Sequence, residues 1–120
     1  MITSNHTTKH PKENWDFTRV KQALNSGRVT FSASAGRDYR NLGMTRDIAI
    51  QCLHQLTELD FYCSYHYADG NIHDSYRAYP YVWFDENEEC EQRDNIFIKL
   101  CLGAGDCLII ERFHCDNGGL

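Results

Sequence analysis

The spacing of hydrophobic residues changes along the chain, from a helical period in the first half to a period of two in the second. In residues 14–27 the apolar side chains recur at helical spacing, at Phe17, Val20 and Leu24. This pattern predicts a helix that Asn14 or Asp16 can cap and that Gly27 can end in a left-handed conformation. Residues 28–34, rich in β-branched and aromatic side chains, predict a short strand, and residues 35–43 predict a short helix.

A second amphipathic helix is predicted to open at Thr45, with an apolar stripe formed by Ile48, Cys52 and Leu56. From Phe61 onward the alternation of side chains indicates strands. A hairpin occupies residues 60–80, and two further strands join at the sequence GAGD. Helices followed by an antiparallel sheet predict an α+β domain, with the helices packed on one face of the sheet.

The first hairpin has the sequence DG at its bend, which predicts a two-residue type I′ turn and thereby a register. In this register His66 lies opposite His73, and Tyr62 lies opposite Arg77. One face then presents mostly apolar side chains, which suit the core: Phe61, Cys63, Tyr65, Tyr67, Ile72, Tyr76 and Ala78. The other face presents Tyr62, Ser64, His66, His73, Ser75 and Arg77.

Two directly opposed imidazoles repel each other when both are protonated, so His66 and His73 are expected to lose their protons in separate steps. A general base must be neutral while a general acid carries its proton, so such a pair could supply both. Two other interpretations stay open. Both histidines can be exposed polar positions on a solvated sheet, or they can hold a metal ion together with a further ligand.

The last two strands contribute positive charge. Lys99 is the one charge in the apolar run IFIKLCL, and pairing about GAGD places it on the same face as Arg112 and His114. Lys99 is either solvated at the sheet edge or directed at an anion, because an unpaired buried charge is costly. Cationic side chains that hold phosphate oxygens, beside imidazoles that exchange protons, suit a phosphodiester substrate.

A length of 120 residues predicts one domain over residues 14–120, preceded by a flexible polar tail over residues 1–13. The tail has no apolar signal region and no stretch of the chain is apolar enough to span a membrane, so we expect a cytoplasmic protein. The six cysteines form no CxxC pair, which favours reduced, packed thiols. We expect no metal and no cofactor.

The net charge of −5 arises in one segment. Residues 85–94 hold six acidic residues and Arg93, while the acidic and basic residues of the rest balance. This segment is either a solvated, mobile loop or a docking site for a basic partner.

Several stretches, in order from about residue 14 to residue 115, resemble the motility quorum-sensing regulator (MqsR) toxins: VKQALNSGRV, LGM, LTELDFYCSY, IHDSYR, IFIKL and DCLIIERFH. The resemblance implies a RelE-like fold. It also implies an endoribonuclease that cleaves mRNA without a metal and is neutralised by a cognate antitoxin protein.

This sequence departs from the family at four positions. Cys63 stands where the family has a lysine thought to act in cleavage, and His73 where it often has a glutamine or an apolar residue. Phe97 replaces an aromatic residue with a hydroxyl, and His114 takes the place of a functional lysine or histidine. The family pattern is kept at Asp74, Tyr76, Arg77 and Lys99. Either the site has been rebuilt around histidines, or the chain is a catalytically inactive interaction or regulatory protein.

The reaction expected for an active toxin is attack of a ribose 2′-hydroxyl on the adjacent phosphate, which leaves a 2′,3′-cyclic phosphate and a 5′-hydroxyl. His73 or His66 would remove the 2′-proton, and His114 would protonate the leaving oxygen. Arg77 and Lys99 would stabilise the charge on the phosphate. The expected RNA contacts are Tyr62, as a stacking partner for a base, together with Tyr76 and Arg112.

Overall fold

The structure is a computed structural model that describes residues 7–116, with the backbone alone for Tyr79. Its helices and strands are, in chain order, β1 (Thr7–His10), α1 (Phe17–Asn25), β2 (Val29–Phe31), α2 (Ala33–Asn41), α3 (Arg46–Leu53), β3 (Phe61–Tyr67), β4 (Ile72–Asp85), β5 (Cys90–Leu102) and β6 (Leu108–Cys115). Two short 3-10 turns, η1 (Glu58–Asp60) and η2 (Ala104–Asp106), precede β3 and β6. None of the helices within the described residues combines the length and hydropathy needed to cross a membrane.

The predicted helices form where their caps lie in the sequence. The Asp16 side chain accepts a hydrogen bond from the Thr18 amide at the start of α1, and Gly27 beyond its end has a φ of 74°. At the start of α3 the Thr45 hydroxyl accepts one from the Ile48 amide. Helix α2 begins two residues before the predicted position, because Ser32 caps it through the Ala35 amide.

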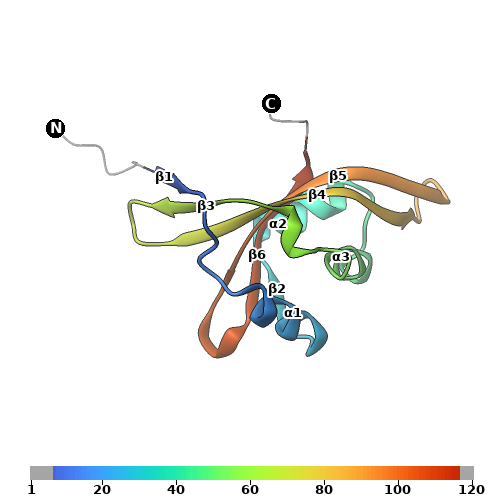
Figure 1. Cartoon of the computed structure of the whole chain (residues 1–120). Coiled ribbons are helices and arrows are strands. Elements are labelled where there is room, and N and C mark those ends of the chain that lie inside the picture. The colour runs from blue at the N-terminus through green and yellow to red at the C-terminus, as the bar shows by residue number, and fades with distance from the viewer. Residues whose placement is uncertain (1–6, 117–120) are drawn as a thin grey trace.

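The six strands form one sheet in the order β1-β3-β4-β5-β6-β2, so the α+β class is confirmed (Figure 1). The sheet is mixed and not purely antiparallel as predicted, because β2 runs parallel to β6. The chain crosses from β2 through α2, α3 and three long strands before β6 returns beside it, a route that a hairpin cannot provide. The predicted tail is also corrected: residues 7–10 form the edge strand β1 on β3, while residues 1–6 lie outside the described part.

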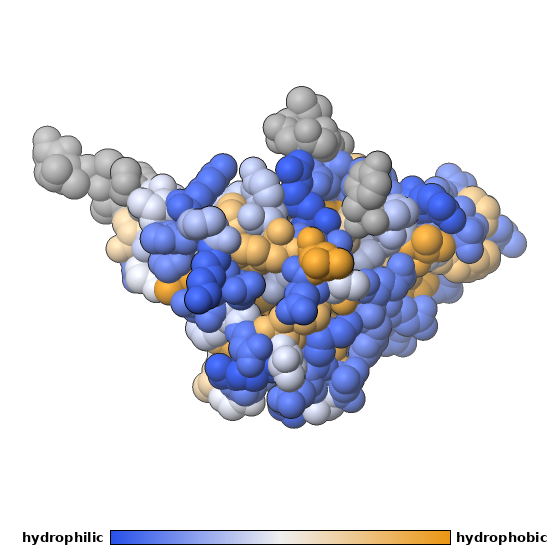
Figure 2. Space-filling model, viewed as in Figure 1, coloured by the Kyte–Doolittle hydropathy of each residue, from blue (hydrophilic) through white to orange (hydrophobic). Residues whose placement is uncertain are grey.

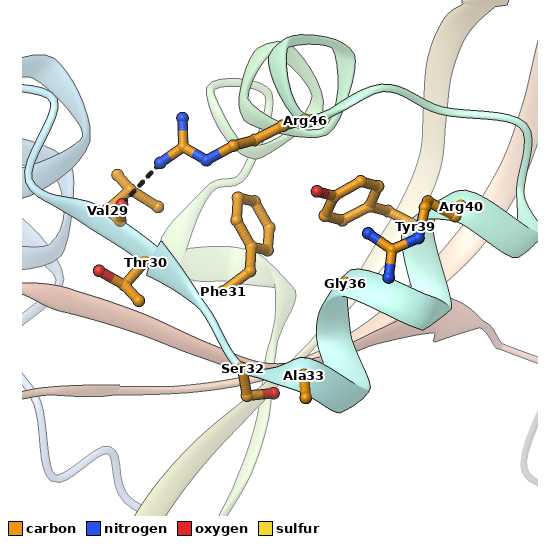
Figure 3. A pocket seen from close by; sticks show the side chains of 9 residues that line it. All are labelled: Val29, Thr30, Phe31, Ser32, Ala33, Gly36, Tyr39, Arg40 and Arg46. Carbon is orange, nitrogen blue, oxygen red and sulfur yellow. Dashed lines mark hydrogen bonds between the residues drawn. The ribbon is translucent and has the colours of Figure 1, made fainter.

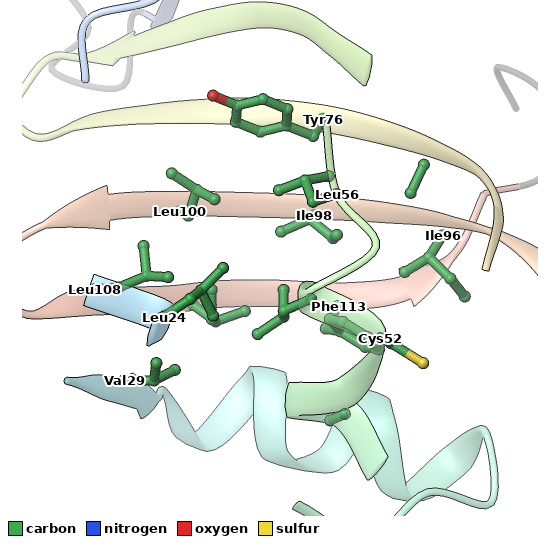
Figure 4. Packing of buried hydrophobic residues seen from close by; sticks show 14 of the residues in the cluster. Leu24, Val29, Cys52, Leu56, Tyr76, Ile96, Ile98, Leu100, Leu108 and Phe113 are labelled. Atoms are coloured by element: carbon green, nitrogen blue, oxygen red, sulfur yellow. The ribbon is translucent and has the colours of Figure 1, made fainter. Parts of the chain in front are cut away.

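The core lies between the helices and one face of the long strands. Figure 1 shows α1 and α3 on the same side of β3, β4 and β5. Figure 4 shows alternate residues of β5 directed into this layer, where they are fully buried: Ile96, Ile98 and Leu100. Leu24 of α1, Cys52 of α3 and Phe113 of β6 pack in the same cluster. We call the opposite face of the strands, which presents Phe97, Lys99 and Cys101, the outer face.

The register of the β3–β4 hairpin differs from the prediction by one residue. The Tyr67 amide donates to the Asn71 carbonyl oxygen, and the Gly70 amide donates to the Tyr67 carbonyl oxygen. These bonds close a three-residue turn in place of the predicted two-residue one. A type I′ turn needs a positive φ at both central residues, and Asp69 does not have one, whereas Gly70 has a φ of 93°. A shift of one residue exchanges the faces of one strand relative to the other. Tyr65 therefore pairs with His73, and His66 pairs with Ile72.

The acidic segment over residues 85–94 is the end of the long β4–β5 hairpin and not a loop between separate strands. Strand β4 runs to Asp85 and β5 begins at Cys90, so only four residues connect them. Asp85 itself is buried, and its carboxylate accepts hydrogen bonds from the Asn87 and Glu88 amides. Figure 1 shows this hairpin end projecting away from the helices.

Candidate functional site

Cross-strand pairs define which side chains share the outer face. Tyr65 of β3 pairs with His73 of β4, Ser75 pairs with Lys99 of β5, and Lys99 pairs in turn with Arg112 of β6. Further along the strands, Arg77 pairs with Phe97, and Phe97 with His114. Paired residues point to the same side of a sheet. The outer face thus brings together four of the five predicted catalytic residues: His73, Arg77, Lys99 and His114.

Lys99 lies at the centre of this face, beside two aromatic rings. Its Nζ atom donates a hydrogen bond to the Tyr67 hydroxyl at 2.8 Å and lies 4.4 Å from the centre of the Tyr65 ring. No carboxylate within the described residues forms an ion pair with it. The ammonium group is held by an aromatic and a hydroxyl partner, and a phosphate oxygen could approach it without first displacing a carboxylate.

His73 lies at one end of the outer face and is half-buried. Its Nε2 atom is 3.7 Å from a Glu111 carboxylate oxygen, and its ring meets the edge of Tyr67 with 5.0 Å between the ring centres. Its Nδ1 atom is enclosed and has no hydrogen-bond partner within residues 7–116. Burial lowers the pKa of His73, and nearby Lys99 lowers it further, while Glu111 opposes both. The imidazole is accordingly neutral at neutral pH.

Arg77 and His114 lie at the other end. The Arg77 guanidinium donates to both carboxylate oxygens of Asp116, at 2.8 and 3.1 Å, and stacks 4.7 Å from the centre of the Tyr62 ring. The His114 ring stacks on Phe97 with 5.4 Å between ring centres, and its Nδ1 atom is 2.9 Å from the Cys115 carbonyl oxygen. A carbonyl oxygen can only accept, so the tautomer that makes this bond carries its proton on Nδ1 and leaves Nε2 as an acceptor.

Arg112 has a structural partner. Its guanidinium donates to both Asp38 oxygens at 2.9 and 3.3 Å, and the Phe113 amide donates to the same carboxylate. Burial alone would raise the pKa of Asp38, but the bonds from Arg112 and Phe113 outweigh it and the pKa is lowered. The pair attaches α2 to the edge of β6. The predicted RNA contact at Arg112 therefore competes with a bond that holds the fold.

Two predicted site residues lie elsewhere. His66 lies on the opposite face from His73 because of the register shift. The centre of its ring is 3.8 Å from the centre of the His10 ring in β1. Tyr76 is only 1% exposed and packs against Phe17 and Phe61, so it offers no surface to RNA. The predicted pairing of the two histidines and the predicted contact at Tyr76 are both wrong. Tyr62, in contrast, is 45% exposed and can stack on a base.

Cys63 also changes face relative to the prediction. It lies opposite Ser75 on the outer face and not with Tyr76 in the core, and the Ser75 hydroxyl donates to its carbonyl oxygen at 2.6 Å. With this correction, the four positions at which the sequence departs from the MqsR pattern all lie on the outer face: Cys63, His73, Phe97 and His114.

Two residues beside His73 were not singled out by the sequence analysis. Glu111 is the extra residue of a β-bulge in β6, opposite the step from Lys99 to Leu100, and a bulge redirects the side chain it carries. Cys101 lies next to it, with 3.9 Å between Sγ and a Glu111 oxygen. Burial, with a contribution from Glu111, raises the pKa of Cys101 to about 11. No sequence motif joins these residues to His73, because each comes from a different strand.

A pocket of about 400 Å³ opens at this end of the face, lined by His73, Cys101 and Glu111 and by the apolar side chains of Trp15, Ile72, Leu102 and Ile109. A second pocket, of about 340 Å³, lies between β2 and α2 (Figure 3). There Arg46 donates to the Val29 carbonyl oxygen at 2.8 Å and lies over the Phe31 ring. Figure 2, in the view of Figure 1, shows hydrophilic side chains over most of the visible surface, with apolar ones gathered near its middle.

Comparison with protein-family models finds no matching family, and comparison with curated proteins finds no match. The fold and the site define a class by themselves: an α+β protein whose mixed sheet is covered by helices on one face and carries cationic, imidazole and tyrosine side chains on the other.

Proposed function

We propose that this chain is a RelE-like toxin of the MqsR type, an endoribonuclease that binds and cleaves mRNA on the outer face. The observation that carries the proposal is the gathering of Lys99, Arg77 and His114 on one side of the sheet, beside exposed or half-exposed tyrosines. The expected place of action is the cytoplasm, and the expected partner is a cognate antitoxin that covers this face.

The aromatic and cationic side chains suit a single RNA strand. Such strands are bound by stacking of bases on aromatic rings and by cations that follow the phosphates. Tyr62, Tyr65 and Tyr67 supply rings along β3, and Lys99 lies within 6 Å of the last two ring centres. A base on a tyrosine and its phosphate on Lys99 would engage one nucleotide at the centre of the face.

The distance between the two histidines changes the expected division of roles. His73 and His114 are separated by four residues along the strands and by two strand spacings, which places their Cα atoms roughly 16 Å apart. An imidazole reaches about 4 to 5 Å from its Cα, so both rings cannot act on one scissile linkage in this arrangement. Lys99 lies between them along β5, but its Nζ atom is bonded to Tyr67, whose ring meets His73, so its side chain would have to turn toward β6 to act with His114.

The proposed reaction is centred on His114. Its Nε2 atom accepts the 2′-proton while the 2′-oxygen bonds to phosphorus and the bond from phosphorus to the 5′-oxygen breaks. Lys99 and Arg77 hold the non-bridging oxygens, where negative charge accumulates, and a water molecule protonates the departing 5′-oxygen. Arg77 gives up one of its two hydrogen bonds to Asp116 and donates to a phosphate oxygen in its place. The products are a 2′,3′-cyclic phosphate and a 5′-hydroxyl.

The test is expression of the chain without an antitoxin, followed by mapping of RNA ends. We expect growth arrest and mRNA fragments with 5′-hydroxyl ends. His114→Ala should reduce the cleavage rate of purified protein by about 100- to 10,000-fold, the usual contribution of a general base. His54→Ala, which removes an exposed imidazole at the end of α3, is the matched control and should cleave normally. Full cleavage by His114→Ala would remove the proposed base.

A second candidate function rests on the end of the β4–β5 hairpin. Most of its acidic residues are exposed: Glu86, Glu88, Glu89 and Glu91. With Cys63 in place of the implied cleavage lysine and Phe97 in place of a hydroxyl-bearing aromatic residue, the chain would be an inactive regulatory protein that binds a basic partner there. Harmless expression, no RNA fragments and retention of the protein on a polylysine surface through these glutamates would favour this function.

A further inference from the structure

Three neighbouring strands place metal-ligating side chains around one point. His73 comes from β4, Cys101 from β5 and Glu111 from β6. One ligand atom from each lies within 4.8 Å of the others, with 3.7 Å between His73 Nε2 and a Glu111 oxygen and 3.9 Å between that carboxylate and Cys101 Sγ. The bulge at Glu111 produces this arrangement, because it turns the carboxylate toward the other two side chains.

We propose that His73, Cys101 and Glu111 form a binding site for one divalent transition-metal ion, with Zn²⁺ as the best match. An imidazole nitrogen, a thiolate and a carboxylate oxygen are the ligand types that zinc takes in proteins, whereas Mg²⁺ and Ca²⁺ prefer oxygen ligands alone. This site does not depend on the proposed RNA cleavage.

The observed spacing suits such an ion after a small contraction. Around a tetrahedral zinc with ligand bonds of 2.0 to 2.3 Å, neighbouring ligand atoms lie roughly 3.3 to 3.8 Å apart. The shorter separations are already near this range, and rotation of the Glu111 or Cys101 side chain can bring the widest one to it. The ligands need no movement of the strands.

The surroundings are those of a site with an open position. The pocket of about 400 Å³ adjoins the three ligands and has apolar walls from Trp15, Leu102 and Ile109, so water or a small anion could take a fourth coordination position. His73 is half-buried, and its Nε2 atom faces the Glu111 carboxylate at 3.7 Å, on the side of the proposed ion. A metal bond would offset part of the cost of burying this ring.

Binding would link the three central strands. An ion that binds only the folded chain raises the ratio of folded to unfolded molecules by about 100-fold when its concentration is 100 times the dissociation constant. Residues far apart in the sequence would then be joined across β4, β5 and β6, and the melting temperature would rise with added zinc.

The experiment is titration of the full chain with Co²⁺, followed by displacement with Zn²⁺, in buffer with a non-chelating reductant. We expect one Co²⁺ per chain and a thiolate-to-cobalt charge-transfer band in the near ultraviolet. Cys101→Ser should abolish the band, and His73→Ala should weaken Co²⁺ binding at least tenfold. Cys107→Ser is the matched control and should keep the full band, because this half-exposed thiol lies in a hydrogen bond with the Thr30 hydroxyl.

Circular dichroism reports whether each variant is folded. If Cys101→Ser does not fold, Glu111→Gln takes its place, with weakened Co²⁺ binding as the expected result. Absence of the band in the unaltered chain, its persistence in folded Cys101→Ser, or its equal loss in Cys107→Ser would each overturn the site. RNA cleavage is not a readout, so failure of the ribonuclease proposal would leave this result unchanged.

Discussion

The two faces of the central strands differ sharply, although their residues alternate in the sequence. On the helix side of β5, Ile96, Ile98 and Leu100 are fully buried in a close-packed apolar layer. Lys99, between the last two, is half-exposed and contacts the tyrosines Tyr65 and Tyr67. One strand thus contributes stability through one face and charge through the other.

One charged residue, Asp74, lies on the buried side, and its surroundings fit the same difference between the two faces. Asp74 of β4 is fully buried beside this layer, and its carboxylate accepts hydrogen bonds from the backbone amides of Asn14 and Trp15, the latter at 2.8 Å. A buried carboxylate is tolerated because these donors satisfy it. Its role is to fix the segment before α1 on the sheet, whereas the charges of the outer face remain accessible to a ligand.

The largest expected effect separates the two faces by stability. Ile98→Ala removes a fully buried side chain from the core and should lower the free energy of unfolding by about 3 kcal/mol, since loss of buried methyl groups also leaves a cavity. The neighbouring Lys99→Met should change it by less than about 1 kcal/mol. Chemical denaturation of both variants measures the difference. Equal destabilisation would show that the two faces do not differ in their contribution to stability.

A smaller effect concerns the edge of the outer face, where Asp38 holds Arg112. Asp38→Asn should cost about 1 to 2 kcal/mol at pH 7, because it weakens charge-assisted bonds to Arg112 and to the Phe113 amide. The pKa of Asp38 is lowered by folding, so its contribution is complete above the ordinary aspartate value near pH 4. It is lost as the pH falls through the folded value.

Unfolding free energies of the unaltered chain and of Asp38→Asn should therefore converge as the pH falls below about 4. Glu86→Gln, at an exposed position in the hairpin turn, provides the control and should follow the unaltered chain at every pH. A difference that persists undiminished in acid would assign the effect of Asp38→Asn to packing and not to its charge.

The smallest effect tests the contact between Lys99 and RNA. A cation that neutralises one phosphate of a single strand adds about 0.7 to the slope of log affinity against log salt concentration. Lys99→Met should reduce the slope for a single-stranded RNA by this amount, whereas Lys12→Met, at an exposed position before α1, should not. An unchanged slope would place Lys99 outside the RNA-binding surface even if cleavage is observed.

Many of the residues of the candidate site were predictable from the sequence, but the way the strands bring them together was not. Lys99, Arg77 and His114 were expected on one face, and alternation along β4, β5 and β6 with the pairing of these strands places them there. The predicted pairing of His66 with His73 is wrong because the turn takes three residues, 68–70, and only Gly70 among them has a positive φ. That single residue determines which face of the sheet each histidine occupies.

The sequence by itself determined the features that depend on near neighbours: the caps at Asp16 and Thr45, the end of α1 before Gly27, and the change to a period of two after residue 60. Only the tertiary structure decided the parallel return of β2 beside β6, the bulge at Glu111 and its approach to His73 and Cys101. The physical reason is the range of the interactions. Caps and periodicity act within a few residues, whereas register, bulges and crossovers are set by the packing of strands that are distant in the chain.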